Sequence, residues 1–325
     1  MGERIGVLVM AYGTASGPDD VERYYTDIRG GRPPTSEHLA ELKARYAAIG
    51  NRFPLLDITR AQADGIVRAL NDGAGPEFRA YLGMKHSPPF IAEGVERMLE
   101  DGVERGVGIV MAPHWSGMSV DTYVERVEGA RRDGEPRFTF VKQWYGDPRF
   151  VAFLASRVSE ALDRLTPDER DGAAVIFSAH SLPQRSVPDG STRCLHCHAC
   201  PDGCRYAAQL DDTRRLVAER LGLAATAIGW QSAGRTADPW LGPPVEAVIR
   251  DLAAKGHPAV VVCSAGFVSD HLEILYDLDI EAQAIAAEAG VRLVRTRMPN
   301  DDPEFVDILA DVVRQHLSTS NGDGG

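Results

Sequence analysis

Short apolar runs rich in β-branched residues alternate with longer amphipathic segments along nearly the whole chain. The short runs have the composition of buried strands, and the longer segments repeat their apolar residues at helical spacing. They predict strands over residues 5–10, 78–82, 108–112, 138–142, 174–178, 225–231, 259–263 and 292–295. They predict helices over 19–28, 36–48, 58–71, 88–101, 119–132, 149–164, 205–220, 243–254, 270–288 and 303–317. The alternation predicts an α/β fold in which helices connect parallel strands.

A turn signal at Gly146, Asp147 and Pro148 divides the chain into two series of similar strand and helix content. We therefore expect two doubly wound, Rossmann-like domains, residues 1–147 and 148–317, with a cysteine-rich insertion near 184–205 in the second. The polar tail, 318–325, is expected to be disordered. Open parallel sheets bind ligands at the carboxyl ends of their strands, so the residues that follow each strand are the first candidates for function.

The composition limits the classes of protein to consider. Of the 325 residues, 44% are hydrophobic and 25% are charged, which is ordinary for a globular protein. The sequence has no apolar stretch of the roughly 18 residues that a membrane-spanning helix needs, and no secretory signal. We expect a cytoplasmic protein without stable membrane insertion. The net charge of −12 opposes binding to nucleic acid.

Histidines follow several of the predicted strands. His180 comes directly after the strand 174–178, where Pro183 makes an immediate helix unfavourable. His86 and His114 occupy similar places in the first half. Each of them, taken alone, is more often a buried, hydrogen-bonded side chain than a functional one. The pattern makes all three candidates without deciding between these two interpretations.

Three carboxylates recur at helical spacing in the predicted helix 270–288. Glu273, Asp277 and Glu281 lie at i, i+4 and i+8, so a regular helix places them on one face. One interpretation is a solvated acidic face. The other is a path for a divalent cation or for protons, because hard and borderline metals prefer oxygen ligands and carboxylates transfer protons.

A group of arginines and tyrosines lies in the first 50 residues, including Arg29, Arg32, Arg45 and Tyr46. Guanidinium groups bind carboxylates, and aromatic faces stack on planar rings. The group therefore suits a planar ligand that carries carboxylates, although a structural surface loop explains the same residues equally well. No glycine-rich phosphate-binding pattern supports nucleotide binding.

Four cysteines lie within eleven residues, with the spacing C-x2-C-x2-C-x3-C. They are Cys194, Cys197, Cys200 and Cys204. In a cytoplasmic protein such crowding indicates a metal centre rather than disulfides. A [2Fe-2S] cluster, a [4Fe-4S] cluster and Zn²⁺ are all compatible with this donor set. The fifth cysteine, Cys263, ends an apolar strand and is expected to pack as a small hydrophobic residue.

Seven ordered segments resemble the ferrochelatase family, over nearly the entire chain, and are most similar to the bacterial enzymes that insert ferrous iron into coproporphyrin III. They are Tyr12–Thr14, Tyr24–Arg32, Arg45–Gly50, Ser178–Pro183, Trp230–Ser232, Asp238–Pro243 and Gly266–Glu273. The agreement of seven segments in one order is far more specific than any single motif.

The resemblance implies roles for individual residues. It implies chelatase-type domains with a porphyrin cleft between them, where His180 and Glu273 are catalytic and meet the Fe²⁺ substrate. Tyr12 would approach the metal from the other face of the ring. Asp277 and Glu281 would form an acidic ridge that leads away from the centre. The remaining substrate contacts that it implies are Arg29, Arg45, Tyr46 and Ser232.

The resemblance also implies the partners. Coproporphyrin carries four propionates, so its binding needs more positive donors than protoporphyrin does. A [2Fe-2S] cluster held by all four cysteines of the insertion is implied, as are a monomer and transient contact with neighbouring enzymes of haem synthesis. Three alternatives stay open: a protoporphyrin IX ferrochelatase, a cobalt or nickel chelatase, and a non-catalytic iron-sulfur or haem-binding carrier or sensor.

Overall fold

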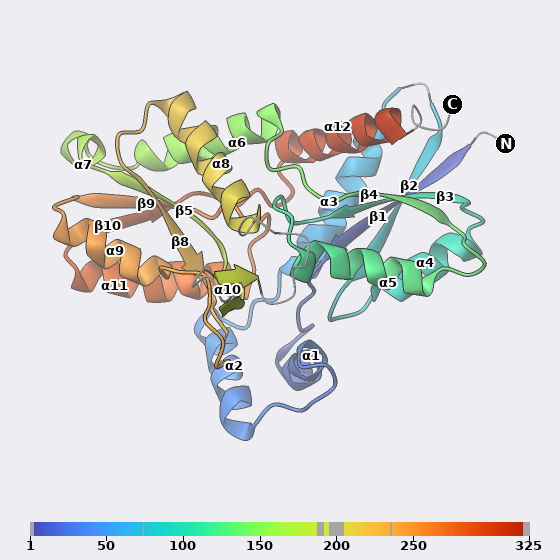
Figure 1. The fold of residues 1–325 in the computed structure, drawn as a ribbon, viewed down its shortest axis with the longest axis horizontal. Coiled ribbons are helices and arrows are strands. Elements are labelled where there is room, and N and C mark those ends of the chain that lie inside the picture. The colour runs from blue at the N-terminus through green and yellow to red at the C-terminus, as the bar shows by residue number, and fades with distance from the viewer. Residues whose placement is uncertain (1–2, 74, 187–191, 195–204, 235, 321–325) are drawn as a thin grey trace.

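Two four-stranded parallel sheets form the centre of the molecule (Figure 1). The computed structural model describes residues 3–73, 75–186, 192–194, 205–234 and 236–320. The first sheet has the order β2-β1-β3-β4, with β1 (Arg4–Ala11), β2 (Glu77–Met84), β3 (Arg105–Val110) and β4 (Arg137–Val141). The second has the order β10-β9-β5-β8, with β5 (Ala174–His180), β8 (Thr226–Gln231), β9 (Ala259–Cys263) and β10 (Arg292–Arg295). The predicted α/β class is confirmed.

Helices cover the sheets and connect their strands. Those of the first half are α1 (Val21–Ile28), α2 (Ser36–Ala48), α3 (Leu55–Leu70), α4 (Ile91–Glu100) and α5 (Thr122–Ala130). Those of the second half are α6 (Pro148–Leu162), α7 (Pro167–Asp171), α8 (Arg205–Leu221), α9 (Val245–Ala254), α10 (Leu272–Leu275), α11 (Gln283–Glu288) and α12 (Pro303–Ser320). A 3₁₀ turn, η1 (Pro18–Asp20), and two π-helical turns, η2 (Gly117–Asp121) and η3 (Asp277–Ala282), complete the set.

The central strands are apolar on both faces because helices lie on both sides of each sheet. Every residue of β9 is buried, and so is all of β1 after Arg4. A separate apolar cluster joins α1 and α2 to the second half, through contacts of Tyr46 and its neighbours with Leu275 in α10. The two helices therefore lie together at one edge of the molecule, next to α10 (Figure 1).

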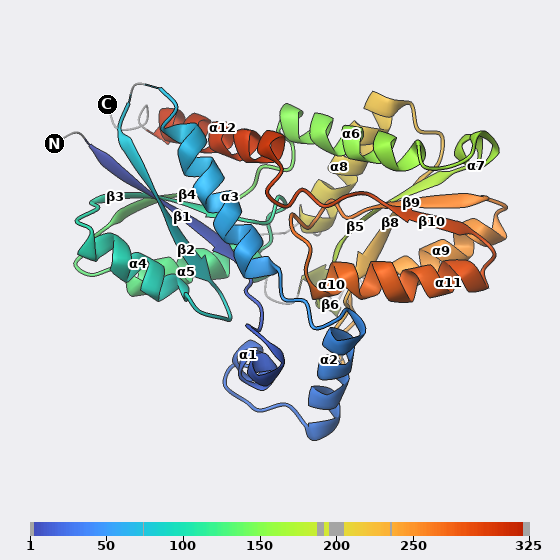
Figure 2. The same ribbon diagram turned by 180° about the vertical axis from the view of Figure 1, so that it is seen from behind.

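The turn at residues 146–148 begins α6. The Asp147 carboxylate accepts hydrogen bonds from the backbone N–H groups of Arg149 and Phe150, at 2.8 and 3.1 Å, and Pro148 occupies the first turn. This is the usual chemistry of a helix N-terminus. The last helix, α12, returns to the first sheet and packs on α3 (Figure 2). It continues to Ser320, so residues 318–320 are helical where we expected a disordered tail, and 321–325 lie outside the described residues.

The expected continuous helix 270–288 is wrong. The chain forms α10, then the π-helical turn η3, and then α11. In η3 the Glu281 N–H donates to the Tyr276 carbonyl five residues earlier, at 3.0 Å, which is the bond that defines a π turn. Helical periodicity alone does not reveal such a widening, because the same apolar residues stay buried.

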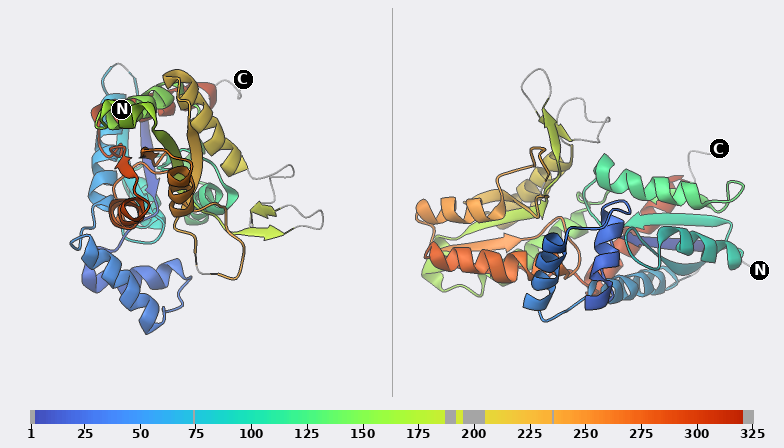
Figure 3. Two further views of the ribbon diagram at one scale, coloured as in Figure 1. Left: turned by 90° about the vertical axis from the view of Figure 1, so that its left-hand side faces the viewer. Right: turned by 90° about the horizontal axis from the view of Figure 1, so that it is seen from below.

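A short antiparallel hairpin was also missed. It pairs β6 (Gln184–Ser186) with β7 (Thr192–Cys194), and it projects from the body of the molecule beside the end of β5 (Figure 3). Each strand has three residues, too few for an alternating pattern to show. The hairpin lies at the start of the cysteine-rich insertion. Among the described helices, none is both long and apolar enough to cross a membrane.

Candidate active site

His180 and Glu273 meet at the point of the second sheet where the order of the strands reverses. From β5 the chain goes to β8 on one side and later to β9 on the other, so the loops after β5 and β9 diverge at this point. His180 is the last residue of β5, and Glu273 lies in α10, after β9. The distance from Nε2 of His180 to Oε2 of Glu273 is 3.7 Å, too long for a hydrogen bond. The structure thus brings together the two predicted catalytic residues.

The His180 ring is oriented by its own loop. Its Nδ1 contacts the backbone carbonyl of Ser181, which can only accept, so Nδ1 carries the proton. In the neutral ring, Nε2 then carries the free lone pair, and this nitrogen faces Oε2 of Glu273. The His180 carbonyl accepts a hydrogen bond from the Tyr206 hydroxyl at 3.2 Å. Tyr206 was not predicted from the sequence; it belongs to α8, which starts directly after the cysteine segment.

The backbone of Glu273 is hydrogen-bonded to the sheet, while Oε2 of its carboxylate has no hydrogen-bond partner. Gln231 at the end of β8 donates from Nε2 to the Glu273 carbonyl at 3.3 Å, and its own Oε1 accepts from Ser178 at 2.7 Å. Oε2 of Glu273 is buried and has no hydrogen-bond partner. Buried polar atoms are rarely left without a partner, so such an oxygen indicates a place for a proton or a cation.

Asp277, four residues after Glu273, is a buried carboxyl group. It is 5% exposed, and its Oδ2 accepts a hydrogen bond from Ser232 at 2.5 Å. Burial, and next the negative charge of Glu273, raises the pKa of Asp277 to about 7, against the effects of Ser232 and Arg45. Asp277 can therefore exchange a proton at neutral pH. Asp277 and Glu281 both lie in η3 rather than in a regular helix, and their role as an acidic ridge stays a prediction.

Arg45 of α2 lies on the acidic ridge. Its guanidinium is 3.6 Å from Asp277 and 3.9 Å from Glu281, and it covers the ring of Tyr276 at 4.8 Å. Burial raises the pKa of Glu281, and Arg45 opposes that shift. In the present structure the positive charge of Arg45 is directed to these carboxylates.

The other residues expected near the propionates lie along α1 and α2. Tyr46 is buried, stacks on Phe53 with ring centroids 4.4 Å apart, and contacts Thr14 through its hydroxyl at 3.3 Å. Arg29 is half-buried at the end of α1, and its Nε donates to the carbonyl of Arg32 at 3.2 Å. Their propionate contacts stay predictions.

Tyr12 approaches the site from the first sheet. It follows β1, exposes 42% of its surface, and packs on His86 with ring centroids 4.6 Å apart. Although part of the side chain is exposed, the protein atoms around the phenol raise its pKa by desolvation, and the charge of Glu273 raises it further. The charge of the Glu273 carboxylate therefore acts on the Tyr12 phenol, although 261 positions separate the two residues in the sequence.

Two basic residues near Tyr12, Lys85 and Arg126, were not predicted from the sequence. Burial and the neighbouring charge of Arg126 lower the pKa of Lys85 to about 8. Lys85 follows β2, so the rule that selects strand ends could have found it. Its neighbour His86 bonds Asp27 through Nδ1 at 2.6 Å, and burial lowers the His86 pKa. Lys85 and Arg126 put positive charge beside Tyr12.

Two residues have the structural role that the sequence favoured. His114 is buried, its Nε2 contacts the Thr213 hydroxyl at 2.9 Å, and burial lowers its pKa to about 3. It stays neutral at physiological pH. Cys263 is a buried free thiol. Cys197, Cys200 and Cys204 lie outside the described residues, and only the backbone of Cys194, at the end of β7, lies within them.

Replacing Asp277 by Asn should flatten the pH dependence of stability. The folded pKa is about 7 and the ordinary value is 3.8, so between them the folded protein binds more protons than the unfolded chain. The free energy of unfolding then falls as pH rises, by up to about 1.4 kcal/mol per pH unit, and this contribution is lost above the folded pKa. Urea unfolding over this range measures the difference. Asp251→Asn, on the exposed end of α9, is the control, and equal slopes for Asp277→Asn and wild type would contradict the prediction.

The two-sheet fold is shared with solved structures of another protein. Two solved structures of SirB from Bacillus subtilis have the same fold, one titled as the sirohydrochlorin chelatase in complex with cobalt and one with Fe³⁺. Their TM-scores are 0.57 and 0.58, each aligning over 98% of this chain and over 97% and 98% of the SirB chains. At 11% and 14% identity they show the fold alone.

The ferrochelatase family model matches residues 4–317, and the chain belongs to this family. Coproporphyrin III ferrochelatase from Anoxybacillus flavithermus is 46% identical over 316 residues, 96% of each chain. The protein of that name from Bacillus subtilis is 44% identical over 318 residues, covering 97% of this chain and 98% of its own length. Within the described residues, no three or more His, Cys, Asp or Glu side chains form a metal-binding group.

Proposed function

We propose that this protein inserts Fe²⁺ into coproporphyrin III. The observation that carries the proposal is the pair at the switch point, where Nε2 of His180 faces Oε2 of Glu273 at 3.7 Å. Relatives about equally long as this chain carry that activity in their names. The porphyrin would lie between the two sheets, with Tyr12 on one face of the ring and the His180–Glu273 pair on the other.

The reaction needs groups that accept protons and one that receives a cation. A porphyrin loses two pyrrole N–H protons as Fe²⁺ enters between its four nitrogens, so the charges balance. An imidazole accepts a proton near pH 7, and Nε2 of His180 is the lone pair available for it. Oε2 of Glu273, which has no hydrogen-bond partner, takes the second proton or guides the cation.

The acidic ridge gives these protons a way out. Asp277, with a pKa of about 7, accepts a proton as easily as it releases one at neutral pH. Glu281, at the outer end, has a side chain that is 38% exposed and can pass the proton to water. Arg45 lies along this path and limits the build-up of negative charge on it. Ser232 keeps Asp277 in place.

We propose coproporphyrin as the substrate because the first half offers several positive side chains as partners for its propionates. Arg29 and Arg32 lie at the end of α1, and Lys85 and Arg126 lie beside Tyr12. Four propionates can use all of them, whereas protoporphyrin presents two propionates and two apolar vinyl groups. Arg45 and Tyr46 complete the substrate contacts that we propose.

An anaerobic assay tests the function. Purified protein is mixed with Fe²⁺ and either coproporphyrin III or protoporphyrin IX at equal concentration, and insertion is followed by the shift of the Soret band. We expect faster turnover on coproporphyrin III. Faster turnover on protoporphyrin IX would identify that porphyrin as the substrate instead. Binding of porphyrin or haem without insertion of iron would identify a carrier or sensor.

We also propose that Cys194, Cys197, Cys200 and Cys204 bind a [2Fe-2S] cluster. The support is the donor set: four thiolates in eleven residues are chemically suited to iron-sulfur clusters. The described chain reaches this segment at Cys194, which is paired with Gln184 in the hairpin, and continues after it at Arg205, where α8 starts. Such a cluster would supply one-electron redox chemistry, which insertion of Fe²⁺ does not need.

Cys197→Ser should abolish the visible absorbance of the cysteine centre. Serine has no thiolate, so an iron-sulfur cluster loses one of its four ligands. Absorbance and iron content of protein purified without oxygen measure the change, and Cys263→Ser, at a buried free thiol, is the control. A [4Fe-4S] cluster would be distinguished by its iron content, and Zn²⁺ by metal analysis of a colourless protein. An unchanged spectrum in Cys197→Ser would exclude this cysteine as a ligand.

We also propose a division of the chain near residue 147 into two halves. Each half is built on one parallel sheet, and α12 crosses from the second half to the first. A cytoplasmic monomer that passes its product on through transient contacts with neighbouring enzymes of haem synthesis fits this activity.

A further inference from the structure

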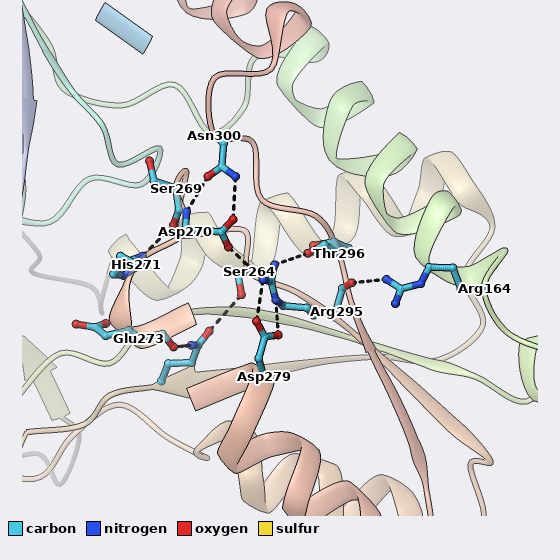
Figure 4. A network of polar contacts seen from close by, with 11 residues as sticks. Arg164, Ser264, Ser269, Asp270, His271, Glu273, Asp279, Arg295, Thr296 and Asn300 are labelled. Atoms are coloured by element: carbon cyan, nitrogen blue, oxygen red, sulfur yellow. Dashed lines mark hydrogen bonds and ion pairs between the residues drawn. The ribbon is translucent and has the colours of Figure 1, made fainter. Parts of the chain in front are cut away.

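Arg295 links two aspartates that flank Glu273 in the sequence. It is the last residue of β10, and its Nε and Nη2 contact the two carboxylate oxygens of Asp279 at 2.6 and 2.9 Å. The same Nη2 contacts Oδ1 of Asp270 at 3.1 Å. Figure 4 shows Arg295 between the two aspartates, while the Glu273 carboxylate extends away from it. One guanidinium therefore holds the segment 270–282 on both sides of Glu273.

The Asp270 end of this segment is held by further contacts. Asn300 donates from Nδ2 to Oδ2 of Asp270 at 2.8 Å and accepts the Asp270 N–H on Oδ1 at 2.7 Å. Gln62 of α3 donates to the carbonyls of Asn300 and Val268, at 2.7 and 3.2 Å. Both oxygens of Asp270 thus have partners, and the start of the segment is joined to both halves of the protein.

The Asp279 end sets the rotation of η3. Asp279 and Asp277 are two residues apart, and residues at this spacing face different sides of a helical turn. Arg295 contacts Asp279, whereas Asp277 contacts Ser232 and Arg45, so the two carboxylates have different partners on different sides of the turn. A π turn is rare and occurs frequently at functional sites, so contacts that keep this one in place bear on the orientation of Glu273 and Asp277.

The charges of this group are only partly accessible to water. The side chain of Arg295 is 18% exposed, that of Asp270 19% and that of Asp279 36%. Salt screens partly buried pairs less than it screens surface pairs, and the fork of a guanidinium fixes direction as well as distance. We therefore expect these contacts to stabilise the segment more than an isolated surface ion pair would.

We propose that Arg295 is a positioning residue for iron insertion, which acts by holding the segment 270–282 so that Glu273 and Asp277 face the site. The proposal rests on the proposed function. Arg295 acts through the backbone, because its contacts are with Asp270 and Asp279 and not with the reacting groups. Loss of the guanidinium should therefore slow the chemical step and leave porphyrin binding nearly unchanged.

Arg295→Gln and Arg292→Gln form a matched pair of variants. Arg292 lies on the same strand, but it contacts Glu169 and the Arg164 carbonyl, at 2.9 and 2.7 Å, away from the segment. We expect Arg295→Gln to lower kcat for iron insertion by about tenfold or more, with the porphyrin KM changed less than about twofold. Hydrogen exchange, read by mass spectrometry without porphyrin, should become faster over residues 270–282. Arg292→Gln should change neither quantity.

A double-mutant cycle separates this role from a general loss of stability. Asp279→Asn should lower kcat in the same direction, and its effect should largely disappear in the Arg295→Gln background, because both changes remove one interaction. Arg295→Lys keeps the charge without the fork, so it should lose less activity, and it replaces Arg295→Gln if that variant does not fold.

Three results would overturn the proposal: wild-type kcat in Arg295→Gln, unchanged exchange over the segment, or full additivity with Asp279→Asn. If the wild-type protein inserts no iron, the proposed function fails instead. Hydrogen exchange would then still decide whether Arg295 holds the segment.

Discussion

His180→Ala should lower the rate of iron insertion by about 100- to 10,000-fold, the usual contribution of a general base. The change removes the Nε2 lone pair that faces Glu273 at 3.7 Å. The fold should remain, because Tyr206 bonds the backbone carbonyl of residue 180 and not its ring. The anaerobic Soret assay measures the rate, and thermal unfolding checks the fold.

Two controls make the result specific. His257→Ala removes a histidine whose Nδ1 contacts the Gly172 carbonyl at 2.8 Å, away from the site, and it should leave insertion unchanged. Porphyrin binding by His180→Ala, followed by quenching of tryptophan fluorescence, should stay within about threefold of wild type if the ring acts mainly in the chemical step. An insertion rate close to wild type in His180→Ala would remove the catalytic assignment.

Several elements of the fold and site could be predicted from the sequence for physical reasons. Buried parallel strands need continuous apolar runs, so β5 and β9 are visible as such. Ligand sites follow the carboxyl ends of parallel strands, which selects Tyr12 and His180 before any coordinates are known. His114 follows the same rule and is nevertheless structural, because burial and not position decides its role.

The features that the sequence did not reveal depend on contacts between distant segments. The π turn η3 is held by Arg295, which lies 16 residues beyond Asp279. Arg45 was expected to bind propionates, and its position on the ridge depends on the packing of α2 against α10. Tyr206 contacts His180 across 26 residues. Neither propensity nor periodicity carries information about such pairs.

Glu273→Gln should also lower iron insertion by at least about 100-fold, because the amide keeps the shape of the side chain but neither takes a proton nor attracts a cation. The Gln231 contact is to the backbone carbonyl of residue 273 and should survive. A matched change at the outer end of the ridge, Glu281→Gln, should cost much less, since that side chain is 38% exposed and water can replace it. Similar losses in both variants would argue against a distinct role for Glu273.

The same variant has a second effect that does not depend on turnover. The negative charge of Glu273 is, after burial, the largest cause that raises the pKa of Asp277 to about 7. With that charge removed, the pKa of Asp277 should fall below its wild-type value, while burial still holds it above the ordinary 3.8. Carboxyl ¹³C NMR titration measures this shift. An Asp277 pKa that stays near its wild-type value would show that the two carboxylates do not share one field, and the proton path from Glu273 to Asp277 would then lose its physical basis.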